Sequence, residues 1–328
     1  MKHRRWAAAV ATVALTSTGG CAAVRSGADP VAAPVSPLDG RRFHADPQGS
    51  APRLVRQWLR DGDPRARALE PLARRATGIW LVGQPDTRSR LGRVARAAVE
   101  RGEVPVVVVY ALPHRDCGSH SAGGLRDRET YLAYVRTVVD ALAGAEAVVV
   151  LEPDAVPQLL DGCLAPQEAQ DRLQLLSEAV ALLAGGRRHV YLDAGHSGWI
   201  GDVDRLAAAL RRAGVERARG FALNVSNFRR TDEVVAYGSR LSQRLGGVGY
   251  VVDTSRNGAG PATSVPTGPA WCNPRGRRVG AAPTGRTGIP GVHAFLWVKV
   301  PGDSDGSCRP GEPRAGTFWP EYALELVD

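Results

Sequence analysis

Polar side chains cluster directly after six of seven short apolar runs in this 328-residue sequence. Carboxylates brought together in this way can donate and accept protons during catalysis. A single aspartate after a strand is more often a helix cap or a turn residue, but six clusters are hard to explain as independent caps. The clusters are Arg115-Asp116-Cys117, Glu152-Pro153-Asp154, Asp193-Ala194-Gly195-His196, Asn224 with Asn227, Asp253 with Arg256 and Asn257, and Asp303 with Asp305.

The apolar runs themselves predict a parallel sheet. Continuous Val, Ile and Leu runs are typical of strands that are buried on both faces. The segments between them have helical length, and in Arg90–Arg101 and Leu125–Ala143 the apolar positions recur every three or four residues. We therefore predict an α/β fold in one domain, residues 41–328, and in barrel-type α/β folds the strand ends meet at one rim. The predicted strands are Gly78–Gly83, Val104–Tyr110, Ala147–Leu151, His189–Leu192, Gly220–Leu223, Gly249–Val252 and Val292–Val298.

Composition narrows the class of protein. A hydrophobic fraction of 44% and a charged fraction of 23% exclude a wholly disordered chain. After the N-terminus, no apolar run is long enough to span a bilayer, which excludes a polytopic membrane protein. The net charge is +9, but the arginines are dispersed and no nucleic-acid-binding motif is present, so we expect no nucleic-acid partner.

The N-terminus predicts export. Lys2, Arg4 and Arg5 precede the apolar run 6–15, so residues 1–21 are interpreted as a signal peptide rather than a buried core helix. Thr18-Gly19-Gly20-Cys21 resembles a bacterial lipobox, although Thr18 stands where an aliphatic residue is usual, and Cys21 is the candidate for lipidation. Residues 22–40 are rich in Pro and Ala and predict a flexible tether. The expected location is extracellular, or anchored to the outer face of the cell membrane.

Cysteine usage agrees with export. Of the five cysteines, a lipidated Cys21 would leave four for two disulfides, with three connectivities open. No Cys-x-x-Cys spacing or other ligand cluster indicates a metal, and no cofactor is expected. The long connection from Asp253 to Val292 has no helical period but contains Trp271 and Cys272, which favours an ordered loop stapled by a disulfide.

The chain contains the strings VVVVYALPHRDC, VVVLEPDAVPQLL, YLDAGHSGWIG, GFALNVSNF, YVVDTSRNG, WCNPRGRRVG and AFLWVKVPGDSDGSC. Together these strings resemble glycoside hydrolase family 6, the family of endoglucanases and cellobiohydrolases that cleave β-1,4-glucans. The resemblance covers nearly the whole chain after the leader. It implies a distorted seven-stranded parallel β/α barrel, similar to a TIM barrel, and the disulfide pairs Cys117–Cys163 and Cys272–Cys308.

The resemblance also implies catalytic roles. Hydrolysis with inversion needs an acid for the leaving oxygen and a base for a water on the opposite face of the sugar. Asp154 matches the general acid, and Asp116 matches the neighbouring carboxylate that would raise the acid's pKa; the alternative for Asp116 is a loop ion pair with Arg115. Asp305 matches the proposed base, acting directly or through water, and Ser121 is our candidate for holding that water.

Sugar recognition needs flat apolar faces ringed by polar groups. Trp80, Trp199 and Trp271 match sugar platforms of the family, against the alternative of core tryptophans. The remaining candidates for substrate binding are Tyr110, Asp193, His196, Asn224, Lys299 and Asp303. Asp193 could equally be a strand-end hydrogen-bond acceptor, and His196 and Asn224 could each fix its own loop. Lys299 could be solvated, and Asp303 stands where Glu is common in the family.

The resulting hypothesis is an exported, monomeric endo-β-1,4-glucanase that hydrolyses β-1,4-glucan or cello-oligosaccharide with inversion of configuration. One alternative is a cellobiohydrolase of the same family. Another is a catalytically weak carbohydrate-binding lipoprotein that keeps the fold.

Overall fold

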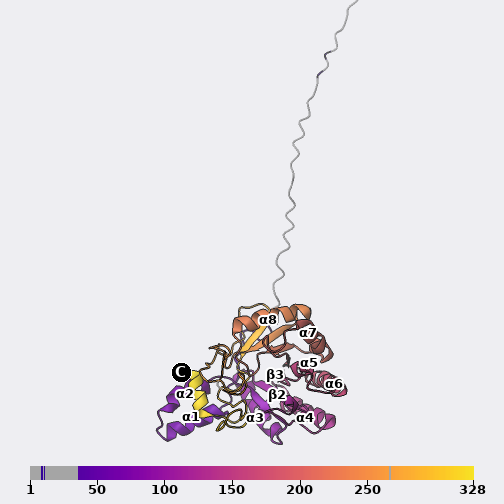
Figure 1. Ribbon diagram of the computed structural model, residues 1–328. Coiled ribbons are helices and arrows are strands. Elements are labelled where there is room, and N and C mark those ends of the chain that lie inside the picture. Colours follow the sequence, from indigo (N-terminus) through magenta and orange to yellow (C-terminus); the bar gives the residue numbers. More distant parts are fainter. Residues whose placement is uncertain (1–8, 10, 12–35, 266) are drawn as a thin grey trace, which may run out of the picture. The chain divides into compact units, whose positions relative to one another are not determined.

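The computed structural model describes residues 9, 11, 36–265 and 267–328 (Figure 1). Most of the expected leader, including Cys21, and most of the expected tether lie outside the described residues. The packed domain begins before the expected start at Arg41, because the Ser36 hydroxyl donates to the His293 carbonyl and Leu38 is fully buried. In the described part of the chain, no helix has both the length and the hydrophobicity that a bilayer crossing requires.

Seven parallel strands form one sheet in chain order, from β1 to β7. This confirms the predicted α/β fold and the seven strands. Two strands match their predicted bounds, and β7 ends two residues early because the N–H groups of Val298 and Lys299 turn to the Asp253 carboxylate. The strands are β1 (Ile79–Leu81), β2 (Val106–Val109), β3 (Ala147–Leu151), β4 (Arg188–Asp193), β5 (Gly220–Leu223), β6 (Gly249–Asp253) and β7 (Val292–Leu296).

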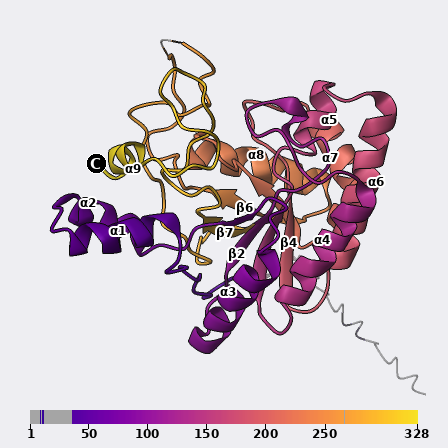
Figure 2. The same ribbon diagram turned by 90° about the horizontal axis from the view of Figure 1, so that it is seen from below.

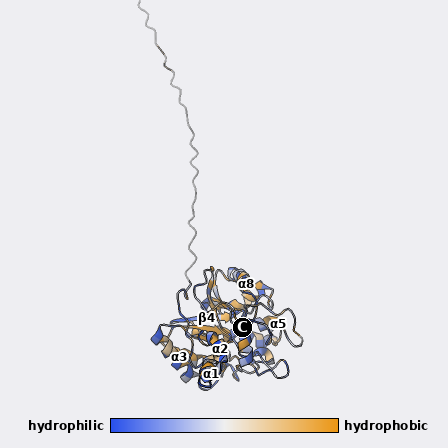
Figure 3. Cartoon of the chain, turned by 90° about the vertical axis from the view of Figure 1, so that its left-hand side faces the viewer, coloured by the Kyte–Doolittle hydropathy of each residue, from blue (hydrophilic) through white to orange (hydrophobic). Residues whose placement is uncertain are grey.

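The central strands β2 to β6 are buried on both faces, as their unbroken apolar runs predict, whereas β1 and β7 alternate between buried and half-buried residues. Val106, Val108 and Val148 contribute to a cluster composed largely of strand residues, inside the curl of the sheet. Their neighbours Val107 and Val149 point the opposite way and pack under the helices. In Figure 3, β4 carries hydrophobic colour, whereas α3 carries much hydrophilic colour.

The first and last strands approach each other and nearly close the barrel. The Gly78 N–H donates to the Trp297 carbonyl at 2.8 Å, and the Trp80 indole N–H donates to the Val298 carbonyl at 3.0 Å. A Cβ at position 78 would lie 2.1 Å from the Val298 oxygen, so only glycine fits at this seam. The seam fixes where the ends of β1 and β7 lie relative to each other.

Helices alternate with the strands and cover the outer face of the sheet (Figure 2). Helix starts follow capping side chains: α4 begins one residue after Asp127, whose carboxylate accepts the Thr130 N–H, and α7 begins after Asp202, which caps in the same way. Gly102 in the left-handed conformation ends α3. The helices are α3 (Thr87–Arg101), α4 (Arg128–Ala141), α5 (Pro157–Asp161), α6 (Pro166–Leu183), α7 (Val203–Arg212) and α8 (Thr231–Arg244).

Three further helices form a small unit beside β7. Helices α1 (Ser50–Arg60), α2 (Arg65–Ala73) and α9 (Pro320–Val327) share a separate apolar cluster that includes Trp58, Leu69 and Trp297. Figure 2 shows them together at one side of the sheet. Between β6 and β7 the chain forms no helix among its described residues, in agreement with the predicted loop.

Candidate active site

The predicted acid lies in the turn that follows β3. Asp154 and Glu152 both have positive φ, 69° and 49°, a conformation that non-glycine residues rarely adopt. The Asp154 N–H donates to the Asp193 carboxylate at 2.9 Å, so this turn is tied to the end of the neighbouring strand β4. The Tyr110 hydroxyl, from the end of β2, lies 3.5 Å from the Asp154 carboxylate. Three predicted site residues thus meet at one rim of the sheet.

The surroundings of Asp154 favour its protonated form. Burial, followed by the negative charges of Asp193 and Asp116, raises the pKa of the Asp154 carboxyl well above its ordinary value. Burial likewise raises the pKa of Asp193 to about 7. A carboxyl that keeps its proton near neutral pH can act as a general acid.

Asp116 lies in the loop between β2 and α4. Its carboxylate accepts the Ser121 N–H at 2.7 Å and the Gln158 amide at 3.3 Å. Burial raises the pKa of Asp116, although these two hydrogen bonds act to lower it. The alternative of an Arg115 ion pair is wrong, because that guanidinium donates to the carbonyls of Tyr110, Ser121 and Ala122. Ser121 therefore contacts Asp116 through its backbone.

Asp305 is held between two cations. Arg256 donates to both carboxylate oxygens at 2.9 Å, and the Lys299 ammonium lies 3.3 Å away. Burial acts to raise the pKa of Asp305, but the charges of Arg256 and Lys299 outweigh it and hold the pKa below its ordinary value. Asn273 donates its N–H to the Asp305 carboxylate and accepts the Asp305 N–H through its amide oxygen, which links Asp305 to the long loop. Lys299 is buried rather than solvated, so the solvated alternative is wrong.

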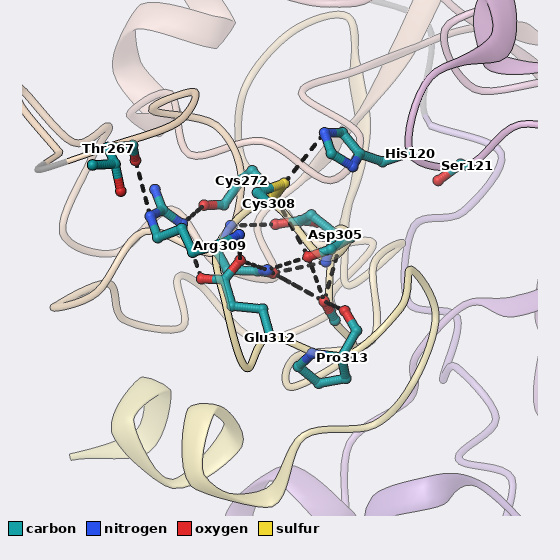
Figure 4. Close-up of a disulfide and its surroundings, with 12 residues drawn as sticks. His120, Ser121, Thr267, Cys272, Asp305, Cys308, Arg309, Glu312 and Pro313 are labelled. Carbon is teal, nitrogen blue, oxygen red and sulfur yellow. Dashed lines mark hydrogen bonds and ion pairs between the residues drawn. A yellow bond between two sulfur atoms is a disulfide. The ribbon is translucent and has the colours of Figure 1, made fainter.

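Two of the predicted platforms lie beside these groups. The Trp80 ring meets Tyr110 edge-on at 5.4 Å between centroids, and the Lys299 ammonium lies 5.9 Å from the Trp80 ring. Trp271 is 44% exposed, so it is not a core tryptophan, and its ring lies 5.8 Å from that of His120. Figure 4 shows His120 directed at the Cys272–Cys308 disulfide, beside the loop of Asp305.

Trp199 lies in the loop between β4 and α7. Its indole N–H donates to Asp161 at the end of α5, and its ring lies 6.1 Å from that of His196. Burial lowers the pKa of His196 to about 4, which leaves the imidazole neutral. Both side chains are partly exposed.

Asp193 and Asn224 were predicted as substrate ligands, but their contacts match the structural roles given as alternatives. Asp193 is 1% exposed, and one of its oxygens accepts the N–H groups of Asp154 and Gly195. Asn224 is fully buried, and its amide bonds to backbone groups, among them those of Asp253 and Arg229. Asp303 differs in exposure, because its side chain is partly exposed. Like Asp193, it has one buried oxygen without a partner, and burial raises its pKa to about 7.

Four supporting residues were not predicted as site residues. Arg256 and Glu152 lie within the polar clusters singled out from the sequence. The sequence therefore indicated their position near the site, but it did not indicate which residues they contact. Glu152 is buried and accepts the N–H groups of Ala111 and Leu112. Gln158 and Arg172 lie on α5 and α6, where nothing distinguishes them from other polar helix residues.

Both expected disulfides are present, Cys117–Cys163 and Cys272–Cys308. The first joins the Asp116 loop to the segment after α5, and the second joins the long loop to the segment after Asp305. A hollow of about 580 Å³ lies beside the first disulfide, lined in part by Arg115 and Glu168.

Comparison with known proteins places this arrangement in a family. The profile described as "Glycosyl hydrolases family 6" matches residues 38–328. The chain is 41% identical over 288 residues to Endoglucanase A of Cellulomonas fimi, covering 87% of this chain and 60% of that protein. It is 42% identical over 284 residues to Endoglucanase 1 of Streptomyces sp. (strain KSM-9), covering 83% of this chain and 76% of that protein.

A solved structure is similar over nearly the same region. The endoglucanase Cel6 of Mycobacterium tuberculosis, in complex with a methyl-cellobiosyl-thio-cellobioside, has a TM-score of 0.82 and 41% identity, covering 89% of this chain and 98% of that one. The rim of carboxylates and indoles therefore lies on a matching fold. The chain belongs to glycosyl hydrolase family 6.

Proposed function

We propose that this protein is an exported endo-β-1,4-glucanase that hydrolyses cellulose-type chains with inversion of configuration. Membership of the family and the names of the similar proteins support a cellulase-type hydrolase. The observation that carries the proposal is the Asp154 carboxyl, kept protonated by burial and by two neighbouring carboxylates at the rim of the barrel.

Asp154 serves as the general acid. Its proton passes to the glycosidic oxygen as the bond to the anomeric carbon breaks, so that the leaving sugar departs as a neutral alcohol. The negative charges of Asp193 and Asp116 keep the proton on Asp154 until it is needed. Tyr110 lies within reach of the same carboxylate.

The water must lose a proton on the opposite face of the sugar. Asp305 is the strongest candidate to receive it, but Arg256 and Lys299 hold this carboxylate ionised and make it a weak base. A chain of water molecules between the attacking water and Asp305 fits such a buried, ion-paired group better than direct contact. Ser121, on the loop of Asp116, is the proposed residue that holds this water.

Substrate binding is assigned to the indole faces. Trp80 and Trp271 would stack on pyranose rings near the reacting bond, and Trp199 with His196 would hold a sugar further along the rim. Asp303 is partly exposed, and we assign its carboxyl group to a sugar hydroxyl. The similar Mycobacterium tuberculosis protein was solved with a cellobiosyl-thio-cellobioside, which supports a cello-oligosaccharide ligand.

The cellobiohydrolase alternative has one structural observation in its favour. His120, on the loop of Asp116, lies 3.6 Å from the Cys308 sulfur, so loops from two sides of the rim touch. Such a contact would favour threading of a chain end over attack within a chain. The size distribution of the products separates endo from exo action.

Export and lipid anchoring are part of the same proposal. The N-terminal pattern supports a signal peptide, and the two disulfides are the kind that persist in an oxidising compartment. Cys21 is the proposed lipid attachment site. Mass spectrometry of the N-terminal peptide from membrane and soluble fractions would test it.

The central experiment measures reducing sugar released from carboxymethyl cellulose and from mixed-linkage glucan, by wild type, Asp154→Ala and Asp204→Asn. Asp204 is a matched surface control, since its carboxylate is 70% exposed in an ion pair with Arg244. We expect activity in wild type and Asp204→Asn and its loss in Asp154→Ala. Equal inactivity of all three, with oligosaccharide still bound, would establish the binding-lipoprotein alternative. NMR of the first product anomer tests inversion.

A further inference from the structure

Two buried polar side chains contact the Asp116 loop, and neither has a part in the catalytic steps proposed above. Gln158, on α5, is 7% exposed, and Arg172, on α6, is 5% exposed. The Gln158 amide nitrogen donates to the Asp116 carboxylate at 3.3 Å, and the Arg172 guanidinium donates to the Gln158 amide oxygen at 3.1 Å. The three side chains form a chain from α6 to the rim.

The direction of the Gln158 amide is determined by its neighbours. Arg172 can only donate, so it must face the amide oxygen, and this leaves the NH₂ group to face the Asp116 carboxylate. Arg172 also donates to the His114 carbonyl at 2.8 Å, two residues before Asp116 in the sequence. The Arg172 guanidinium therefore fixes both the Gln158 amide, which donates to Asp116, and the backbone two residues before Asp116.

Gln158 is also linked to the acid. Its N–H donates to the Asp154 carbonyl at 2.9 Å, so Gln158 lies one helical turn after Asp154. The same short turn thus presents the acid and, through Gln158, contacts the neighbouring carboxylate. The electrostatic energy between two charges depends on their separation. A contact that fixes Asp116 relative to Asp154 therefore determines how strongly the two carboxyl groups interact.

We propose that Gln158, locked by Arg172, is a positioning residue that holds the Asp116 carboxylate in its orientation beside Asp154. The inference rests on the proposed function, because it assigns Gln158 a part in the acid step. The charged groups around Asp116 are Arg115 and His120 on its own loop and Asp154 on the β3–α5 turn. Glu152 and Glu168 are the charged groups around Arg172.

The test compares wild type with Gln158→Leu, Arg172→Lys and the double variant, on a soluble β-1,4-glucan across pH. Leu removes the donor to Asp116, and Lys keeps the charge at 172 but loses the forked contact with Gln158 and His114. We expect kcat to fall by about 10- to 100-fold in Gln158→Leu, with little change in KM, since misplacement of a catalytic group has effects of this size. The double variant should lose no more than the larger single loss, because the two residues act in series.

The pH profile provides a readout that a merely structural role would not move. Once Asp116 is free to turn away, its charge acts less on Asp154, which then ionises at lower pH. The alkaline limb of kcat/KM should therefore move to lower pH in Gln158→Leu. Gln167→Leu is the matched control: Gln167 is exposed on the same helix as Arg172 and donates to Asp171, so it loses the same kind of hydrogen bond away from the site.

The outcomes separate this inference from the proposed function. A wild type without activity on any β-1,4-glucan contradicts the proposed function; ¹³C NMR titration of Asp116 in wild type and Gln158→Leu then still tests the positioning, through a changed titration midpoint. An active wild type whose Gln158→Leu variant keeps its kcat and its alkaline limb overturns the inference. Fully additive losses in the double variant overturn it as well. Thermal unfolding of each variant confirms that folded protein is compared.

Discussion

The N–H of Asp154 donates to the carboxylate of Asp193 across two neighbouring strand ends, at 2.9 Å. This one hydrogen bond fixes the strained turn that carries the acid and brings a second negative charge close to it. Asp193 therefore acts on Asp154 both as a geometric anchor and as an electrostatic neighbour.

Asp193→Asn separates these two effects. The Asn oxygen can still accept the Asp154 N–H, but the charge that raises the pKa of Asp154 is removed. Asp154 should then lose its proton at lower pH, and the alkaline limb of kcat/KM should move down by about one pH unit. A pH–rate profile on a soluble glucan measures this; an unmoved limb would mean that Asp193 is already neutral in the working enzyme.

Glu152→Gln should change how stability depends on pH. Burial raises the pKa of Glu152 to about 7, above its value in the unfolded chain, so its contribution to stability is full in acid and is lost as the pH rises from about 4.3 through 7. Gln cannot ionise and can still accept the N–H groups of Ala111 and Leu112. Relative to wild type, the variant should gain up to roughly 3 kcal/mol between pH 5 and pH 8. Urea denaturation at both pH values measures the gain, and a constant difference would contradict it.

Arg256→Met should destabilise the fold strongly. Arg256 is fully buried and donates two hydrogen bonds to Asp305, so its loss leaves a buried carboxylate with Lys299 as its remaining cation. Removal of one partner of a buried ion pair costs about 3–5 kcal/mol. Arg244→Gln, which breaks an exposed pair with Asp204, is the control and should cost less than about 1 kcal/mol. Similar losses in the two variants would argue against a special role for burial.

Removal of the Cys272–Cys308 disulfide should affect stability and catalysis together. The bond closes a segment with a sequence separation of 36 residues, and replacement of both cysteines by serine should cost roughly 2–4 kcal/mol of unfolding free energy. Asn273 directly follows Cys272 and bonds to Asp305, so kcat should fall as well. Denaturation and steady-state kinetics of the double-serine variant measure the two effects. A loss of stability with unchanged kcat would show that Asn273 stays in place without the disulfide.

The strands and the rim could be predicted because a strand that is buried on both faces appears in the sequence as a continuous apolar run that ends in polar residues. Ala147–Leu151 is an unbroken apolar run bounded by Glu146 and Glu152, and its strand has those bounds. Helix starts were less accurate: α4 was expected from Leu125 but begins at Arg128, because Asp127 caps it. Capping depends on one side chain and leaves no periodic signal.

The supporting contacts could not be predicted, since they join residues far apart in sequence. Arg172 lies on an amphipathic helix of an arginine-rich chain, and its burial follows from the packing of α6 against the rim. Asp193 and Asn224 were open to two interpretations from sequence, as substrate ligands or as structural acceptors. Their burial and contacts in the structure favour the second.

The seam between β1 and β7 links the proposed sugar platform at Trp80 to the stability of the barrel. The Trp80 indole N–H donates to the Val298 carbonyl just after β7, so replacement of Trp80 would remove the proposed platform and one of the hydrogen bonds that join the two edges of the sheet. Attempts to evolve a new glycan preference at this position should therefore begin from a variant stabilised elsewhere. Trp271 lies in the exposed loop between β6 and β7 and does not join the edges of the sheet, so its replacement should disturb the barrel less.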